Sequence, residues 1–228
     1  MVFQTVSEDK ERNIIQNTIL KWWSKNKRDF PWRNTKNPYH IIIAELLLRK
    51  TTAGQVEKIY SSFIKKYPNP HVLFKADKSE LKEMIKPLGM EHKRTKLLKK
   101  FAEFLTTELN SKIKCNDFEL LKIPGVGSYA KNAVLCLSFN KDEPLLDTNF
   151  IRFIKRVYGL NSSKARIRDD KNFWNFAKSI IPKGIGRKFN LAILDFSSIV
   201  CTARNPQCST CPINNFCNFY LKSRMFIY

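Results

Sequence analysis

The sequence has little glycine, little strand-like alternation and no long apolar run. Only 7 of its 228 residues are glycine. No stretch approaches the roughly 20 apolar residues that a membrane-spanning helix requires. The N-terminal segment MVFQTVSEDKERN lacks the apolar core of a signal peptide. These absences argue against a β-rich fold and a membrane protein, and they predict a soluble intracellular protein of a reducing compartment.

Acidic charge is also scarce. The chain has 41 Lys and Arg against 20 Asp and Glu, which gives a formal net charge of +21. Such an excess opposes self-association and attracts polyanions. The basic residues run through the whole length, which favours a nucleic-acid partner over a merely lysine-rich composition. We therefore expect a monomer that binds nucleic acid.

Helical spacing of apolar residues recurs between proline and glycine breakers. One apolar stripe runs from Ile14 to Trp23, a second from Ile41 to Leu47 and a third from Leu97 to Leu105. Most segments between breakers are long enough for a helix of ordinary length, so we expect about ten helices. The pattern predicts an all-α fold.

Four of the six cysteines gather near the C-terminus. The pattern C-x6-C-x2-C-x5-C is formed by Cys201, Cys208, Cys211 and Cys217. Thiolates this close in sequence reach one metal centre with little loop-closure entropy. Zinc and a [4Fe–4S] cluster both accept four cysteines, but zinc sites usually pair two short arms and only one is short here, which favours iron–sulfur. Cys115 and Cys136 stand apart, and we expect both to be small buried apolar residues.

The segment KIPGVGSYA, residues 122–130, joins two stretches that read as helices, 109–121 and 130–139. Its proline and its two glycines, Gly125 and Gly127, make a short turn without a charged side chain. Glycine lets the backbone approach a surface closely. The N–H groups that open the next helix attract an anion such as a DNA phosphate. The segment is typical of a DNA-gripping helix-hairpin-helix and equally of an ordinary αα-hairpin.

The residues that follow favour the first alternative. Asp147 comes after the apolar pair Leu145-Leu146 and before the basic segment TNFIRFIKR, where its carboxylate is placed to cap a helix. The turn, the aspartate about 20 residues on and the four-cysteine pattern together resemble the helix-hairpin-helix DNA glycosylases of the endonuclease III and MutY superfamily. The resemblance extends from about Ile19 to Tyr220.

The resemblance implies an all-α fold of two domains. A six-helix barrel domain would span 31–142 and contain the helix-hairpin-helix at about 115–139. Residues 1–30 and 143–228 would form a second helical domain with the cluster loop at 201–217. A [4Fe–4S] cofactor on the four cysteines is implied, with double-stranded DNA carrying a mismatched or damaged base as the partner and no redox step in the chemistry.

Tyr129 bears on the type of glycosylase. In lyase-type members the second residue after the last hairpin glycine is a lysine that forms a Schiff base with the sugar. Tyr129 stands at this position, and a phenol cannot form an imine. Lys131 is turned by about 200° along the helix, so we expect it to contact phosphate or solvent. The resemblance therefore implies a monofunctional glycosylase that uses water and leaves an abasic site.

Other motifs bear on the substrate. The segments ELLLRKTTAG, RDFPWR, DTNFIRFIKR and FNLAILDFSS are similar to those of archaeal-type G·T mismatch-specific thymine glycosylases. Adenine glycosylases of the MutY type read L-Q-Q-T after the early glutamate and have glycine where Thr148 stands. They usually carry a C-terminal Nudix-like domain, for which the residues after Cys217 are too few. The resemblance thus favours removal of thymine or uracil opposite guanine.

Catalytic roles are implied for four residues. Asp147 would stabilise the positively charged sugar or activate water, and Asn149 would hold that carboxylate or the water. Glu45 lies among apolar residues, where desolvation should raise its pKa and suit a proton donor or a water-positioning base. Tyr129 would lie against the flipped base or sugar.

The DNA contacts implied by the resemblance lie on loops and on the hairpin. They are Arg49, Lys50, Met90, Gly125, Gly127 and Lys131. Lys50 and Met90 would enter the gap left by the flipped base, and Arg49 or Lys50 would hydrogen-bond the orphaned guanine. Four alternatives are an adenine glycosylase, a bifunctional lyase, a non-catalytic iron–sulfur DNA-binding protein and a zinc-ribbon nucleic-acid binder.

Overall fold

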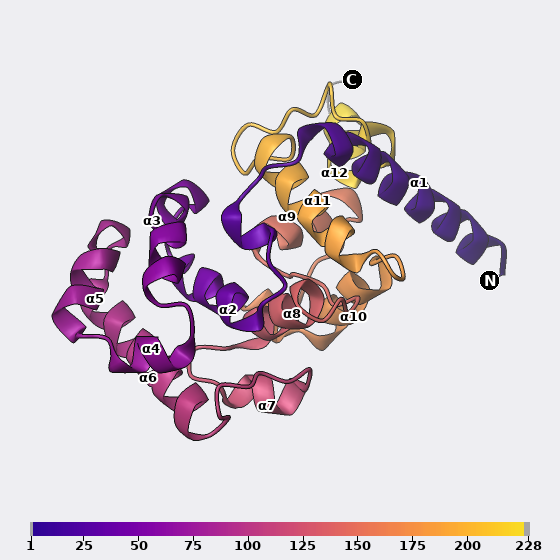
Figure 1. Ribbon diagram of the computed structural model, residues 1–228. Helices are drawn as coiled ribbons and strands as arrows, with labels where there is room; N and C mark the ends of the chain where they lie inside the picture. The colour runs from indigo at the N-terminus through magenta and orange to yellow at the C-terminus, as the bar shows by residue number, and fades with distance from the viewer. Residues whose placement is uncertain (1, 226–228) are drawn as a thin grey trace. The chain divides into compact units, whose positions relative to one another are not determined.

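The computed structural model describes residues 2–225, and within them the chain is all-helical (Figure 1). This range contains twelve α-helices, four short 3₁₀ helices and no strand, which confirms the predicted all-α class. The described residues divide into two compact units. One unit contains the chain up to Arg28 together with the chain from Asn140 on, and the other runs from Asp29 to Phe139. None of the described helices combines the length and apolar character needed to cross a membrane.

Seven α-helices build the unit of residues 29–139. They are α2 (Pro38–Leu47), α3 (Ala53–Lys66), α4 (Pro70–Lys75), α5 (Lys78–Ile85), α6 (Glu91–Thr107), α7 (Asp117–Lys122) and α8 (Ser128–Leu137), with 3₁₀ helices at Pro31–Arg33 and Lys86–Leu88. Side chains at the N-caps fix where several helices begin. Thr52 and Gln55 form a reciprocal capping box at α3, and Asn69, Asp77 and Asn116 accept backbone N–H groups at α4, α5 and α7.

The core of this unit forms around α2, which is buried along most of its length. α2 packs against α8, and α6 packs against α4 and α5. Leu46, Phe63 and Phe101 are fully buried and contribute large apolar side chains. The predicted helix at 109–121 is wrong over its first half. Asn110 and Ser111 have positive φ values of 44° and 59°, which break the helix, and α7 begins only at Asp117.

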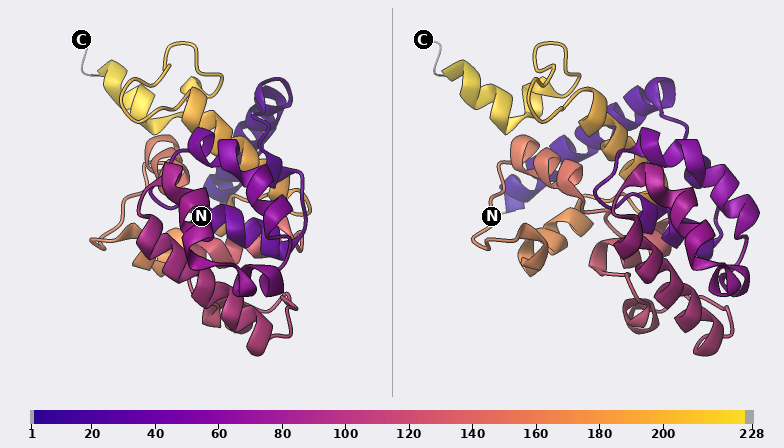
Figure 2. Two further views of the ribbon diagram at one scale, coloured as in Figure 1. Left: turned by 60° about the vertical axis from the view of Figure 1, so that its left-hand side comes forward. Right: turned by 90° about the vertical axis from the view of Figure 1, so that its left-hand side faces the viewer.

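Five α-helices build the other unit. They are α1 (Val2–Asn26), α9 (Thr148–Val157), α10 (Lys171–Ser179), α11 (Gly186–Ile199) and α12 (Asn218–Met225), with 3₁₀ helices at Ile167–Asp169 and Asn214–Phe216. α11 packs against α1 and α9, and α12 packs against α9 (Figure 2). The core is rich in phenylalanine. Its fully or almost fully buried rings are Phe150, Phe153, Phe173, Phe189 and Phe196.

α1 packs through one apolar face, and a buried carboxylate of α11 binds the residues at the C-terminal end of α1. Ile15 and Ile19 are buried, but Ile14 is 38% exposed, so including it in the predicted stripe was wrong. One residue along a helix rotates the side chain by about 100°, which here turns Ile14 away from buried Ile15 and Ile19 towards solvent. Fully buried Asp195 of α11 accepts hydrogen bonds from Trp23 Nε1 at 2.8 Å and Arg28 Nε at 2.6 Å. These hydrogen bonds connect the C-terminal end of α1 and the residues just after it to α11.

Candidate functional site

Asp147 is the N-cap residue of α9, as the sequence predicts. Its Oδ1 accepts the backbone N–H of Phe150 at 2.7 Å, and its Oδ2 accepts the side-chain amide of Asn149 at 2.8 Å. Burial raises the pKa of Asp147 above its ordinary value, while these hydrogen bonds and the positive charge of Arg168 act in the opposite direction. The two hydrogen bonds thus hold the Asp147 carboxylate in one orientation, and burial removes part of its contact with water.

The chain that leads into Asp147 is anchored by Asn190 of α11. Asn190 is fully buried, and its Oδ1 accepts the backbone N–H of Leu145 at 2.8 Å. Its Nδ2 donates to the carbonyls of Glu143 and Gly186, both at 2.9 Å. One side chain thereby satisfies main-chain groups just before Asp147. No role for Asn190 was predicted, although it lies in the motif FNLAILDFSS.

A line of hydrogen bonds runs from Asp147 towards the cysteine loop. Asn149 donates to Asp147, and Asn149 Oδ1 in turn accepts Arg152 Nη2 at 3.0 Å. The guanidinium of Arg152 also donates from Nη2 to the carbonyl of Ser197 at 2.6 Å and from Nε to the carbonyl of Cys201 at 2.8 Å. Arg152 therefore links the carboxylate at the start of α9 to the first cysteine of the loop.

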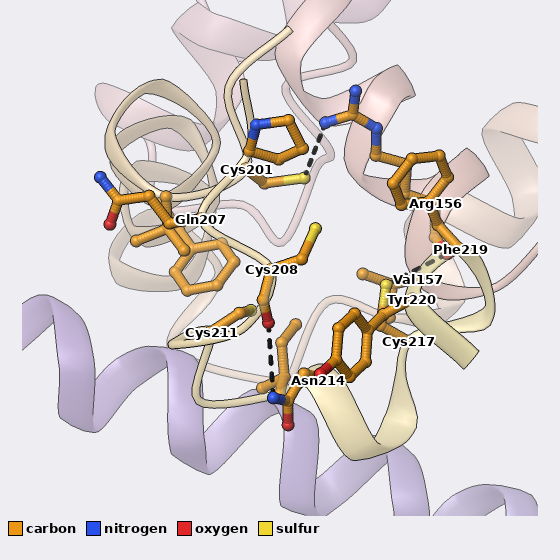
Figure 3. Close-up of a pocket in the computed structure, with 14 residues that line it drawn as sticks. Arg156, Val157, Cys201, Gln207, Cys208, Cys211, Asn214, Cys217, Phe219 and Tyr220 are labelled. Carbon is orange, nitrogen blue, oxygen red and sulfur yellow. Dashed lines mark hydrogen bonds between the residues drawn. The ribbon is translucent and has the colours of Figure 1, made fainter. Parts of the chain in front are cut away.

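The four predicted ligand cysteines surround one cavity (Figure 3). Apolar side chains line much of it, including Val157, Phe196, Val200 and Ile213. Within the described part of the chain, no three His, Cys, Asp or Glu side chains are arranged to hold a single metal ion. Four sulfurs around a largely apolar cavity fit the ligand set of an iron–sulfur cluster.

Arg156 of α9 closes one side of this cavity (Figure 3). Its Nη1 lies 3.4 Å from Cys201 Sγ and donates to the carbonyl of Thr202 at 2.6 Å, and Nη2 donates to that of Ala203 at 3.0 Å. The same guanidinium lies 4.9 Å from the ring centroid of Phe219. Arg156 thus fixes the start of the cysteine loop and places a positive charge beside its first sulfur.

Burial favours the neutral form of three thiols of this loop. It raises the pKa of Cys211 to about 11, and it also raises the pKa of Cys208 and Cys217. The charge of Arg156 lowers the pKa of Cys208 but does not cancel the effect of burial. Cys201, Cys208, Cys211 and Cys217 would hold an iron–sulfur cluster as thiolates, and its positive iron ions would favour that form.

The hairpin predicted at residues 122–130 joins α7 to α8, and its two glycines differ. Gly125 has φ +88°, and a Cβ on it would lie 2.8 Å from Leu46 Cδ2 and 3.1 Å from Leu97 Cδ1. A Cβ on Gly127 would meet nothing within 4 Å. No side chain caps the N-terminus of α8 at Gly127. Gly125 therefore serves the packing of the turn, whereas Gly127 leaves the backbone open to an approaching group.

The side chain of Lys131 forms an ion pair with another residue of the hairpin. Its Nζ contacts Asp117 Oδ2 at 2.5 Å, and its side chain is only 16% exposed. This ion pair joins the first residue of α7 to the first turn of α8. The sequence gives little indication of the Lys131–Asp117 ion pair, because Asp117 lies 14 residues before Lys131. A phosphate contact by Lys131 stays a prediction.

The other predicted residues of the 29–139 unit lie on neighbouring elements. Glu45 is half-buried on α2, between buried Ala44 and Leu46, and Tyr129 is half-buried in the first turn of α8. Because α2 packs against α8, these two side chains belong to adjacent helices. Arg49 donates from Nη2 to the carbonyl of Gly125. A hydrogen bond from Arg49 or Lys50 to the orphaned guanine stays a prediction.

Lys50 and Met90 lie in exposed loops, as predicted. Both have a left-handed backbone, with φ values of 54° and 55°. Met90 is 46% exposed, so it is a surface residue and not part of the core. Cys136 is buried as predicted, but the prediction for Cys115 is wrong. Cys115 is exposed in the irregular segment before α7, where there is no helix face to bury it.

Two family models match parts of this chain. The family model described as HhH-GPD superfamily base excision DNA repair protein matches residues 43–178. The iron–sulfur binding domain of endonuclease III matches residues 201–217. This second match confirms the iron–sulfur prediction, and the cysteines that would hold the [4Fe–4S] cluster are those around the cavity.

Two proteins similar to this chain, one curated relative and one solved structure, share most of their length with it. A thymine/uracil-DNA glycosylase of Pyrobaculum aerophilum is 46% identical over 212 residues, covering 91% of this chain and 92% of that protein. The solved structure of a thermostable thymine-DNA glycosylase has a TM-score of 0.89 at 39% identity and covers 95% of this chain and 99% of its own. An adenine DNA glycosylase of Buchnera aphidicola is more distant, at 31% identity over 60% of its length. The chain belongs to the HhH-GPD superfamily of base excision DNA repair proteins.

Proposed function

We propose that the protein is a monofunctional DNA glycosylase that hydrolyses the N-glycosidic bond of thymine or uracil opposite guanine and leaves an abasic site. The observation that carries this proposal is the carboxylate of Asp147, fixed by Phe150 and Asn149 at the start of α9. A carboxylate held in this way is suited to stabilising positive charge that develops on a sugar. The relatives named thymine/uracil- and thymine-DNA glycosylase support the choice of base.

The proposed reaction breaks the bond between the sugar C1′ and the base nitrogen. Electrons of that bond leave with the base, and Glu45 donates a proton to the departing base or orders the water. Asp147 stabilises the oxocarbenium-like sugar, and water adds to C1′ as Asp147 takes up its proton. Tyr129 lies against the flipped nucleotide, and Asn149 keeps the carboxylate in place. The sugar keeps its phosphates, so the product is an abasic site.

Two observations support hydrolysis over lyase chemistry. Tyr129 stands at the position where a Schiff-base lysine would be needed. Lys131, the nearest lysine after the turn, has its ammonium group bound to Asp117. An amine that is protonated in an ion pair is a poor nucleophile.

The DNA contacts follow from the hairpin and the basic charge. The open backbone at Gly127 would accept a phosphate at the start of α8, with Gly125 shaping the turn. Lys50 and Met90 would enter the gap left by the flipped base, and Arg49 or Lys50 would hydrogen-bond the orphaned guanine. The [4Fe–4S] cluster on Cys201, Cys208, Cys211 and Cys217 would hold its loop in shape.

We also propose the wider setting of this activity. The unit of residues 29–139 would be the helical barrel domain with the hairpin, and the other unit would be the cluster domain. The net charge of +21 disfavours self-association, which supports a monomer acting on double-stranded DNA. Action on chromosomal DNA in a prokaryotic cytoplasm is part of the same proposal.

The test of monofunctional chemistry uses duplexes with G·T, G·U and A·G pairs and borohydride trapping. We expect strand breaks at T or U only after alkali, with no protein trapped on DNA. Breaks without alkali, together with a trapped complex, would indicate a lyase and return attention to Lys131. Breaks at A would place the protein with the adenine glycosylases.

A further inference from the structure

Arg94 of α6 is a buried cation that binds main-chain carbonyls. Arg94 is only 6% exposed. Nη1 donates to the carbonyls of Leu46 at 2.6 Å and Leu47 at 3.1 Å, and Nη2 donates to that of Arg49 at 3.1 Å. These carbonyls lie at the C-terminal end of α2 and just beyond it, where a helix leaves its carbonyls unpaired and attracts positive charge.

The same residue touches the loop of Met90. The backbone N–H of Arg94 donates to the carbonyl of Met90 at 2.9 Å, which is the main-chain bond of the first turn of α6 and places the Arg94 side chain on the turn that Met90 begins. Its side chain meanwhile holds the carbonyl of Arg49, in the peptide that leads into Lys50. Lys50 and Met90 both have the left-handed backbone that non-glycine residues adopt at a free-energy cost. Such conformations persist where the surroundings fix them. The side chain of Arg94 connects the first turn of α6, which follows Met90, to the carbonyl of Arg49, which precedes Lys50.

Arg49 extends the connection to the hairpin. Its carbonyl accepts Arg94, and its own guanidinium donates to the carbonyl of Gly125. Two arginines therefore join three segments of one unit: the loop that carries Lys50, the loop that carries Met90 and the turn at Gly125. These are the segments to which the proposed function assigns the DNA contacts.

We propose that Arg94 is a positioning residue that holds the Lys50 loop, the Met90 loop and the hairpin as one preformed surface for a duplex with an extruded nucleotide. The inference rests on the proposed function and adds the residue that prepares its DNA contacts. A preformed surface avoids the entropy of ordering two loops at the moment of binding. This advantage applies to DNA with a gap that Lys50 and Met90 can enter, and much less to an intact duplex.

If Arg94 only stabilised the fold, its substitution would affect DNA binding no more than the substitution of a comparable residue elsewhere on α6. Lys99, on the same helix, offers a matched comparison because its Nζ donates to the carbonyls of Leu73, Phe74 and Ala76 at the end of α4. Both side chains are cations of α6 that bind main-chain carbonyls at a helix C-terminus. Only Arg94 binds beside segments with proposed DNA contacts. If capping were its sole task, Arg94→Met and Lys99→Met would affect DNA binding alike.

The test compares affinities for two duplexes, one fully paired and one with a tetrahydrofuran abasic analogue opposite guanine. The selectivity ratio is the Kd for the paired duplex divided by that for the abasic one. We expect Arg94→Met to lower this ratio about tenfold, as befits lost hydrogen bonds from a charged group. Arg94→Lys should retain part of the ratio, and Lys99→Met should leave it unchanged while lowering thermal stability.

The outcomes separate the inference from the proposed function. An equal ratio in folded Arg94→Met and wild-type protein would overturn the role of Arg94, and so would an equal fall in Lys99→Met. If Arg94→Met does not fold, Arg94→Lys decides: a ratio unchanged from wild type overturns the inference, and a lowered ratio supports it. Binding does not require base release. A wild-type protein that prefers abasic DNA but releases neither T nor U would refute the proposed function alone.

Discussion

The two hairpin glycines should respond in opposite ways to substitution by alanine. At Gly125 the new residue must adopt φ +88°, which costs an L-residue about 1–2 kcal/mol. Its Cβ would also press on Leu46 Cδ2 at 2.8 Å, and overpacking of a core costs about 1–3 kcal/mol. Gly125→Ala should therefore lose about 2–5 kcal/mol of unfolding free energy, a fall in Tm of roughly 5–15 °C.

At Gly127 the structure predicts little change in stability. Its φ of −95° and ψ of −176° are available to any residue, and no atom lies within 4 Å of the added Cβ. The loss of a good N-cap residue and the stiffer unfolded chain largely offset each other, so stability should change by less than about 1 kcal/mol. The methyl group would instead stand where a phosphate approaches, and we expect duplex binding to weaken about tenfold.

Urea unfolding and fluorescence anisotropy with a duplex measure the two effects on the same proteins. Binding of folded Gly125→Ala should be measured well below its Tm, so that unfolding does not mimic lost affinity. The reasoning would be refuted if Gly127→Ala bound DNA like wild type. It would also fail if Gly127→Ala were destabilised as much as Gly125→Ala.

Three further predictions concern the start of α9 and the cysteine loop. Asn149→Ala removes a hydrogen bond that lowers the pKa of Asp147, so this pKa should rise. The acidic limb of the pH–rate profile should then move to higher pH. Asn172→Ala, in the equivalent position after the N-cap of α10, should leave that limb where it is in wild type. Arg152→Met should lower single-turnover base release about tenfold or more while iron content and visible absorbance persist, and unchanged release would show that the link from Asp147 to the loop is dispensable. Arg156→Met should speed loss of visible absorbance under chelator, and a wild-type rate of loss would contradict its role at the loop.

The fold and the cofactor site were predictable because their signals are local. Apolar spacing of the kind seen at Ile41 to Leu47 predicts a helix, and the four cysteines fall within one short segment. The N-cap role of Asp147 is likewise local, since the group it binds belongs to Phe150, three residues on. Errors arose where the pattern was weak, as at Cys115 in an irregular loop.

The supporting residues could not be predicted because their partners are distant main-chain groups. Arg94 binds carbonyls 45 to 48 residues earlier, and Arg152 binds a carbonyl 49 residues later. Every residue has a carbonyl, so no sequence pattern marks which one an arginine will reach. The same holds for Asn190, whose partners depend on how α11 packs. Only the tertiary structure reveals these contacts.

The most direct test of the account measures base release by wild type and Asp147→Asn from a G·T duplex under single-turnover conditions. Asparagine is nearly isosteric and can keep much of the cap, but it cannot carry the negative charge. We predict that release of thymine falls at least about a hundredfold while the affinity for the abasic-analogue duplex is retained. Thymine release at the wild-type rate by Asp147→Asn would contradict the central role given to this carboxylate.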